Sequence, residues 1–159
     1  MSSNFLNDNL FSVHENSNKI FIETESQKYS FKEFDDLVNK IANLLIASGL
    51  SEGDRVLVKL EKSIFSFALY ISTIRAGGIF IPVNTDYTAS EIEYFIDNSM
   101  PYIFISNDKS LKEVKNKNLK TFSLNNDGSG TFNKNVRTQK TSFQSVKKKK
   151  DDIGFILDT

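Results

Sequence analysis

Few residues of this 159-residue chain have the type and spacing of a catalytic group. His14 is the single histidine, and no pattern of serine and aspartate around it suggests a catalytic triad. Because the chain has no second histidine and no cysteine, it also lacks the ligands of a soft metal site. We therefore predict a solvent-exposed His14 and assign neither a catalytic nor a metal-binding residue.

Two pairs of adjacent aspartates are the remaining candidates for acid–base chemistry. They are Asp35 with Asp36 and Asp151 with Asp152. Neighbouring residues on a helix or a strand point in different directions, so neither pair forms a shared carboxylate site. We interpret both pairs as helix-cap or surface residues.

A glycine-containing segment, N-D-G-S-G at residues 126–130, has part of the pattern of a phosphate-binding loop. The dinucleotide fingerprint needs a third glycine and then a helix whose N-terminus faces the phosphates. Asn133 stands where that glycine would be, and no amphipathic pattern follows it. We predict a turn here, and we interpret the lysine run at residues 147–150 as a solvated linker.

The net charge of the chain is zero but unevenly distributed. Residues 1–106 carry a net charge of −6, residues 107–150 carry +9, and the last nine residues carry −3. A basic segment can bind a phosphate-rich partner. The sparse aromatic residues between the lysines do not form a platform for stacking bases, so nucleic acid is not an expected partner. A nucleic-acid-associated domain acting through residues 107–150 stays an alternative.

The composition is that of a globular protein, with 39% hydrophobic and 25% charged residues. No apolar run approaches the roughly 20 residues that span a bilayer. The first residues show neither a basic stretch nor an apolar stretch of the kind found in secretory signals. Together with the lack of cysteine, these observations predict a cytoplasmic protein.

Strand-like and helix-like patterns alternate along the chain. We predict strands over 20–24, 55–60, 79–83, 102–106, 119–124 and 153–157, and helices over 31–48, 64–75, 90–98 and 108–115. Such alternation favours an α/β fold, mainly a parallel sheet with right-handed crossover helices.

Residues 75–88 form the joint between two of these helices and the strand between them. Two glycines after Ala76 end the first helix, and residues 79–83 are an apolar run typical of a strand buried on both faces. Pro82 has no N–H group, so the strand ends there or lies at an edge. Thr88 and Glu91 form a capping box that begins the next helix. We expect this joint at the centre of the sheet.

The domain organisation is simple. We predict one domain over residues 1–159, with a flexible surface loop over 125–150 inside it, because that stretch is polar and contains Gly128 and Gly130.

Three blocks of sequence resemble a known family. They are Y-S-F-K-E-F at residues 29–34, G-L-S-E-G-D-R-V at 49–56 and I-R-A-G-G-I-F-I-P-V-N at 74–84. These blocks are similar to those of the adenylate-forming acyl-CoA synthetases, also called AMP-binding enzymes. The stretches E-K-S at 61–63, L-Y-I-S-T at 69–73 and N-T-D-Y-T at 84–88 resemble the malonyl-CoA synthetase branch. The resemblance covers residues 18–106 well and 107–150 poorly.

The resemblance implies a fold, a reaction and cofactors. The fold is the N-terminal subdomain of the acyl-CoA synthetase fold, in incomplete form. The reaction joins a carboxylate to ATP as an acyl-adenylate and then forms a thioester with CoA, which implies ATP, Mg²⁺ and CoA as cofactors and a small malonate-like carboxylate as substrate.

The family's phosphate loop has the pattern Y-T-S-G-T-T-G-x-x-K-G, and residues 151–157 resemble the strand before it. Thr159 matches the first threonine of that loop and is the one cofactor-binding residue that we predict. Asp158 stands where an aromatic or aliphatic residue is usual.

We therefore expect the N-terminal part of an ATP-dependent carboxylate–CoA ligase that is inactive as an isolated 159-residue chain. The alternative is a non-enzymatic module that docks a complementary C-terminal chain.

Overall fold

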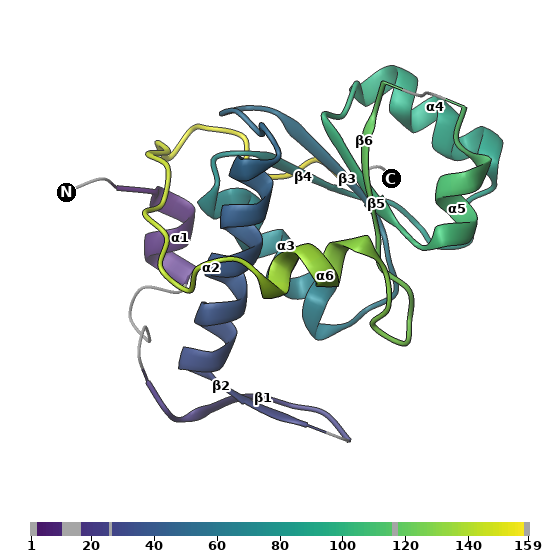
Figure 1. Ribbon diagram of the computed structural model, residues 1–159. Helices are drawn as coiled ribbons and strands as arrows, with labels where there is room; N and C mark the ends of the chain where they lie inside the picture. The colour runs from purple at the N-terminus through teal and green to yellow at the C-terminus, as the bar shows by residue number, and fades with distance from the viewer. Residues whose placement is uncertain (1–2, 11–16, 26, 116–117, 158–159) are drawn as a thin grey trace.

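The computed structural model describes residues 3–10, 17–25, 27–115 and 118–157 (Figure 1). In chain order its elements are α1 (Phe5–Leu10), β1 (Ile20–Glu23), β2 (Lys28–Ser30), α2 (Phe31–Ala47), β3 (Arg55–Lys59), α3 (Ile64–Arg75), β4 (Ile79–Pro82), α4 (Ala89–Ser99), β5 (Ile103–Ser106), α5 (Asp108–Glu113), β6 (Lys120–Ser123) and α6 (Thr131–Arg137).

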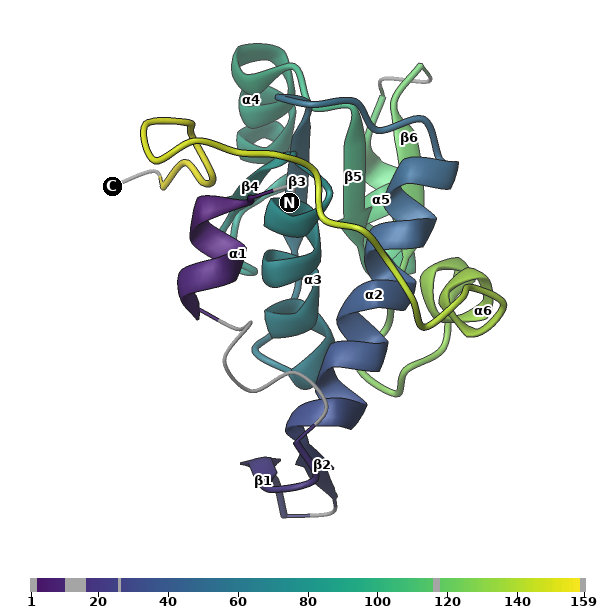
Figure 2. The same cartoon turned by 90° about the vertical axis from the view of Figure 1, so that its left-hand side faces the viewer.

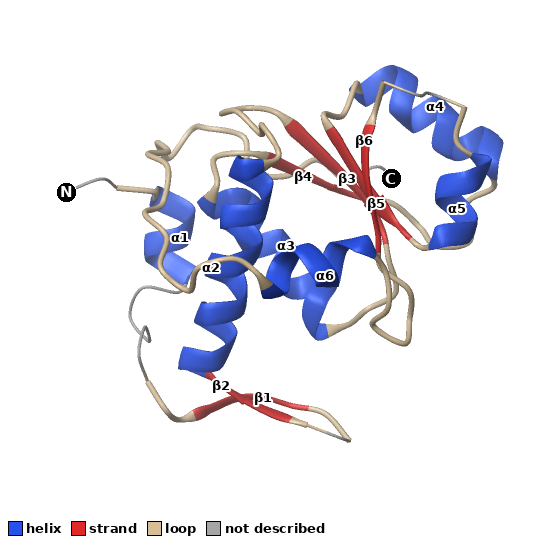
Figure 3. Cartoon of the chain, in the orientation of Figure 1, coloured by secondary structure: helices blue, strands red, loops and turns tan. Residues whose placement is uncertain are grey.

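The centre of the fold is a four-stranded sheet with the strand order β4-β3-β5-β6, in which each neighbouring pair is parallel. β1 and β2 form a separate antiparallel hairpin (Figure 3). The helices α3, α4 and α5 connect the parallel strands in turn. The predicted α/β fold with a mainly parallel sheet and crossover helices is confirmed.

Helices cover both faces of the sheet. In Figures 1 and 2, α2, α3 and α6 lie on one face and α4 and α5 on the other. The strand β3 shows why both faces are needed: Val56 and Val58 belong to the core under α2 and α3, while Leu57 belongs to the core under α4. Each of the three side chains is at least 97% buried. An apolar run without alternation is what a parallel strand buried on both faces requires.

The starts of the longer helices follow local sequence. The Ser30 hydroxyl accepts from the Glu33 backbone N–H, and the Glu33 side chain accepts from the Ser30 backbone N–H, which completes a capping box for α2. Thr88 and Glu91 do the same for α4. Ser63 begins α3 in the same way with Ser66 as its partner. These bonds satisfy N–H groups that a helix cannot pair internally, so the predicted starts are confirmed.

The expectation that the strand over 79–83 lies at the centre of the sheet is wrong for the four-stranded sheet, because β4 is its edge strand. On the outer side of β4, the described residues form an isolated parallel bridge between Phe80 and Phe155. The Phe80 N–H donates to Gly154 O at 3.0 Å, and the Ile156 N–H donates to Phe80 O at 3.0 Å. The strand predicted over 153–157 is reduced to this bridge.

Pro82 gives a physical reason for so short a pairing. The N–H groups of Ile79 and Val83 donate toward β3, to Asp54 O and Val58 O, so those of the alternate residues face outward. Phe80 has an N–H to offer on that side, and Pro82 has none. Pro82 therefore cannot donate the next hydrogen bond of the outer ladder. β4 ends at Pro82 and is an edge strand of the four-stranded sheet, as predicted.

The prediction of a structureless loop over 125–150 is wrong for its middle part, where α6 forms. Phe132 and Val136 are buried against the core formed with α2 and α3. They stand four residues apart, so they share one helix face in an otherwise polar stretch. Gly130 has a φ of +126° before α6, and a Cβ there would lie 2.2 Å from Ser123 O, so only glycine fits. The mobility of the rest of this stretch stays a prediction.

Within the described ranges, no helix is both long enough and apolar enough to cross a bilayer.

Candidate functional site

The carboxyl ends of the four parallel strands meet at one edge of the sheet, here called the carboxyl edge. From β3 the chain passes through α3 to β4 on one side, and from β5 it passes through α5 to β6 on the other side. The connections that leave the neighbouring strands β3 and β5 therefore run in opposite directions along the sheet. This point between two strands is called a topological switch point, and open α/β sheets bind ligands there. A polar cavity of about 70 Å³ lies there, lined by Lys59, Leu60, Glu61, Thr85, Asn107, Leu124 and Asn126.

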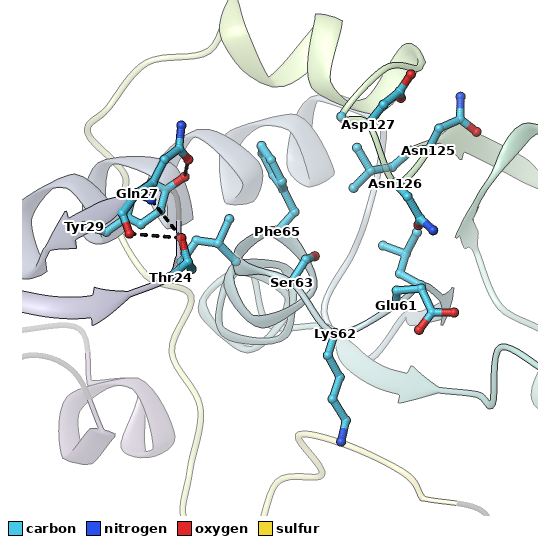
Figure 4. Close-up of a pocket in the computed structure, with 14 residues that line it drawn as sticks. Thr24, Gln27, Tyr29, Glu61, Lys62, Ser63, Phe65, Asn125, Asn126 and Asp127 are labelled. Atoms are coloured by element: carbon cyan, nitrogen blue, oxygen red, sulfur yellow. Dashed lines mark hydrogen bonds between the residues drawn. The ribbon is translucent and has the colours of Figure 1, made fainter.

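A larger pocket of about 640 Å³ adjoins this edge. Its walls come from the β1–β2 hairpin, the β3–α3 loop and the β6–α6 turn. The lining residues are Thr24, Gln27, Tyr29, Leu60, Glu61, Lys62, Ser63, Ile64, Phe65, Leu124, Asn125, Asn126, Asp127 and Gly128. Figure 4 shows the hairpin residues on one side, the Asn125–Asp127 turn on the other, and Phe65 and Ser63 between them.

A cluster of aromatic side chains holds the β1–β2 hairpin in position as one wall of the larger pocket. The Phe21 ring stacks on Phe31 with centroids 4.4 Å apart and lies 5.1 Å from Phe34. Both partners belong to the first turn of α2, so the hairpin is held against the helix that follows it. Thr24 and Gln27 reach the pocket as a result, and they bond to each other through the Thr24 hydroxyl.

The turn at residues 126–129 does not form a phosphate cradle. The Asp127 carboxylate accepts from the Ser129 hydroxyl at 2.6 Å and from the Ser129 backbone N–H at 2.9 Å. These two bonds lower the pKa of Asp127, the side-chain bond most. A carboxylate thus occupies the donors that a phosphate would need, and the predicted turn is confirmed. The expectation that no helix follows is wrong, since α6 begins at Thr131.

A second carboxylate is bonded to the residue that precedes this turn. Asp108, the first residue of α5, accepts from Asn125 Nδ2 at 2.8 Å. That bond, followed by one from Ser123, lowers the pKa of Asp108. Glu61 and Lys62 line the larger pocket, and Lys59 and Glu61 line the smaller cavity, so charges of both signs border the carboxyl edge.

Lys59 is a buried cation at the switch point. It is the last residue of β3, 8% exposed, and its Nζ donates to Tyr87 O at 2.5 Å. Its own carbonyl accepts from the Ser106 hydroxyl at the end of β5. Lys59 therefore ties the β4–α4 loop to the ends of two central strands. Sequence reasoning missed it, because a lysine ending an apolar strand is indistinguishable from a surface residue by pattern alone.

Arg75 is the centre of a second buried polar network. Its Nη1 donates to Asp35 Oδ1 at 2.8 Å and to Asn39 Oδ1 at 2.6 Å, and its Nε donates to Asn7 Oδ1 at 2.8 Å. The Arg75 side chain is 3% exposed and that of Asp35 is 22% exposed. The network joins α1, α2 and α3. The interpretation of Asp35 as a cap or surface residue is therefore wrong, although Asp35 and its neighbour do point to different partners.

The remaining predicted residues are placed only in part. Thr159 and His14 lie outside the described residues. Asp152 accepts from the Lys149 N–H at 2.6 Å, as a capping residue does. Lys148 has a largely buried side chain whose Nζ lies 3.7 Å from the Glu52 carboxylate, so the lysine run is not wholly a solvated linker.

No group of three or more metal-ligating side chains occurs among the residues that the structure describes. Among these described residues, the carboxyl edge therefore has a pocket with polar groups in its walls but no carboxylate cluster of the kind that holds Mg²⁺.

Comparison with known proteins identifies the family of this chain and structures similar to it. The profile of the AMP-binding enzyme family matches residues 11–159. MatB from Rhodopseudomonas palustris superposes in its apo form over 100% of this chain, with a TM-score of 0.91 and 32% identity. Its ATP-bound form superposes over 99%, with a TM-score of 0.92 and 31% identity. In both cases the match covers 32% of the MatB chain.

Curated relatives are more distant. Crotonobetaine/carnitine–CoA ligase from Citrobacter koseri is 24% identical over 102 residues, which is 62% of this chain and 20% of the ligase. Gramicidin S synthase 1 from Brevibacillus brevis is 26% identical over 94 residues, which is 59% of this chain and 9% of the synthase. The chain thus spans about a third of MatB and a fifth or less of these two relatives.

Proposed function

The chain belongs to the AMP-binding enzyme family, and from this membership we propose that it forms the N-terminal part of an ATP-dependent carboxylate–CoA ligase. The observation that carries the proposal is the superposition of almost the whole chain on MatB with its bound ATP, at 31% identity. The ligase forms an acyl-adenylate from a carboxylate and ATP and then transfers the acyl group to CoA.

The proposed substrate is a small malonate-like carboxylate. The support comes from the E-K-S, L-Y-I-S-T and N-T-D-Y-T stretches, which resemble the malonyl-CoA synthetase branch. In the structure two of these stretches lie at the carboxyl edge: Glu61 and Thr85 line its cavity, and Lys59 bonds to Tyr87, whereas residues 69–73 lie inside α3. We further propose a cytoplasmic enzyme of fatty acid metabolism.

Within such a ligase, these residues act as scaffold. Phosphoryl-type chemistry depends on positioned charge and metal. The described residues hold no carboxylate cluster for Mg²⁺, and the donors of Ser129 in the 126–129 turn are taken by Asp127. ATP and Mg²⁺ therefore do not fit on these residues alone. The chain supplies a sheet packed on both faces, the pocket at its carboxyl edge, and the residues 154–156 that pair with β4. We propose that the isolated 159-residue chain is inactive.

An adenylation assay tests the inactive state. The purified 159-residue chain is incubated with ATP, Mg²⁺, CoA and malonate, and both pyrophosphate release and thioester formation are followed. We expect no turnover above a blank without protein. Robust turnover would refute the scaffold role, because it would require phosphate-binding residues that the described structure does not contain.

A non-enzymatic docking module is the second candidate. The observation that favours it is the exposure of Ile153, Phe155, Ile156 and Leu157 beside the edge strand β4. Large exposed apolar patches mark interaction surfaces. This candidate predicts that co-expression with the downstream part of a ligase yields a soluble complex, and two insoluble pieces would count against it.

A further inference from the structure

We propose that Asn4, at the start of α1, positions the segment 146–156 along the outer edge of β4. The bearing of this role on catalysis rests on the proposed function, because residues 151–157 resemble the strand that precedes the family's phosphate loop. Asn4 lies far from the pocket at the carboxyl edge, and it acts through the backbone that it holds.

The Asn4 side chain is fully buried and has a partner for each polar group. Its Nδ2 donates to Ile74 O at 3.0 Å and to Val146 O at 2.8 Å, which uses both amide protons. Its Oδ1 accepts from the Asn7 backbone N–H at 3.1 Å. One carboxamide therefore bridges the end of α3 to a segment that lies 142 residues further along the chain than Asn4 itself.

Backbone bonds of Val146 and Lys148 complete the attachment. The Phe5 N–H donates to Lys148 O and the Lys148 N–H donates to Ser3 O, each at 3.0 Å, in a parallel bridge. The Val146 N–H donates to Arg75 O at 2.9 Å. The segment is thus fixed between α1 and the last turn of α3, as Figure 2 shows from the side of α1.

The far end of the segment is also in contact with α1. A Cβ on Gly154 would lie 2.5 Å from Leu6 Cδ1, so the helix packs directly against that glycine. Gly154 O and the Ile156 N–H are the two groups that bond to Phe80 on β4. Figure 1 shows the chain passing from α6 over α2 to α1, where the segment begins, and then to β4. The contacts of α1 therefore set how the chain approaches the sheet edge.

The interaction has the energetic weight to act as a constraint. The pairing of the segment with β4 is one isolated bridge, which by itself is weak. Removal of the Asn4 carboxamide takes this donor from the part-buried Val146 carbonyl and leaves Ile74 O with the Gly77 N–H alone, which costs more than the loss of an exposed hydrogen bond. The bridge to β4 should therefore open when Asn4 is truncated, while the central strands stay closed.

Amide hydrogen exchange of the 159-residue chain tests the inference. In Asn4→Ala we expect exchange at the Ile156 and Phe80 amides at least about tenfold faster than in the parent chain, with no change at Leu57 and Phe104 in the central strands, because local opening is independent of the stable core. The readout needs no enzymatic activity, so a failure of the proposed ligase function would leave this test intact.

Asn43→Ala is the matched control. Asn43 also donates from Nδ2 to two backbone carbonyls after α6, Lys140 O at 3.0 Å and Ser142 O at 2.9 Å, but upstream of the segment. We expect unchanged exchange at Ile156 in this control. Leu6→Ala is a second variant for the case that Asn4→Ala does not fold. It removes the packing of Leu6 against Gly154 without removing a hydrogen bond, and it should also raise the exchange rate of the Ile156 amide. Unchanged exchange at Ile156 in Asn4→Ala, or an equal rise in both asparagine variants, would overturn the inference.

Discussion

Replacement of Asp35 by asparagine tests the buried ion pair that ties α2 to α3. The change keeps the size of the side chain and removes its charge, so no cavity forms. Arg75 then stays 97% buried without a carboxylate partner. Loss of one partner of a buried pair costs about 3–5 kcal/mol, and we expect about 3 kcal/mol because Asp35 is partly open to water.

The assay is urea unfolding followed by circular dichroism. With a slope of about 2 kcal/mol per molar urea, a loss of about 3 kcal/mol lowers the unfolding midpoint by about 1.5 M. The matched control is Asp36→Asn in the adjacent residue. Its carboxylate lies 2.8 Å from Lys32 Nζ in an exposed pair, for which we expect no resolvable shift of the midpoint. Equal shifts in the two variants would refute the assignment of the buried network to Asp35.

Three further predictions use the same unfolding assay. Phe132→Ala should cost about 3–5 kcal/mol, as for a fully buried phenylalanine, and a loss below about 1 kcal/mol would show that α6 is not docked. Gly77→Ala should destabilise the protein more than Gly53→Ala. Both glycines have a φ of +81°, but a Cβ on Gly77 would lie 2.8 Å from Val146 Cγ1, whereas a Cβ on Gly53 would meet no atom within 4 Å. Equal losses of stability would contradict the packing of Val146 on Gly77. The backbone N–H and the hydroxyl of Ser30 lower the pKa of Glu33, so the stability that this carboxylate contributes is present above its ordinary pKa of 4.5 and is lost as the pH falls through its folded pKa. In Glu33→Gln the free energy of unfolding should therefore fall less between neutral and acidic pH than in the parent chain. An equal fall in both proteins would contradict this prediction.

The features that sequence predicted well are local. The capping boxes of α2 and α4 need only residues three positions apart, and the apolar stripe of α2 is visible in one window of sequence. The run R-V-L-V-K shows burial on both faces without any knowledge of its neighbours. For this reason the types and approximate boundaries of β1 and of the elements from α2 to β6 follow from sequence.

The features that sequence predicted poorly depend on distant residues. Strand order is set by how crossovers pack, so the edge position of β4 could not be read from its own residues. The helix α6 has only two buried residues in a polar stretch, and the six residues of α1 have no repeating apolar pattern. Both helices depend on contacts with elements far away in sequence, such as the bonds from Asn4 to Ile74 and Val146.

The sequence contains signals for where the candidate site lies but not for which residues form all of its walls. Polar residues directly after the strands, such as Glu61, Asn107 and Asn125, were the available signal for a pocket at the carboxyl edge. The contribution of Thr24 and Gln27 was not visible, because it depends on how the Phe21 cluster docks the hairpin. Recognition of the family came instead from the spacing of the sequence blocks, most clearly residues 74–84.

The central claim is that this chain supplies the scaffold of a carboxylate–CoA ligase without its phosphate-binding chemistry. The most direct test is carboxylate-dependent exchange of pyrophosphate into ATP by a chimera in which this chain replaces the matched 32% of R. palustris MatB. The controls are this chain alone and the remaining part of MatB alone. The account predicts exchange by the chimera and none by either part. Exchange by this chain alone, or a folded chimera no more active than the remaining part of MatB, would contradict it.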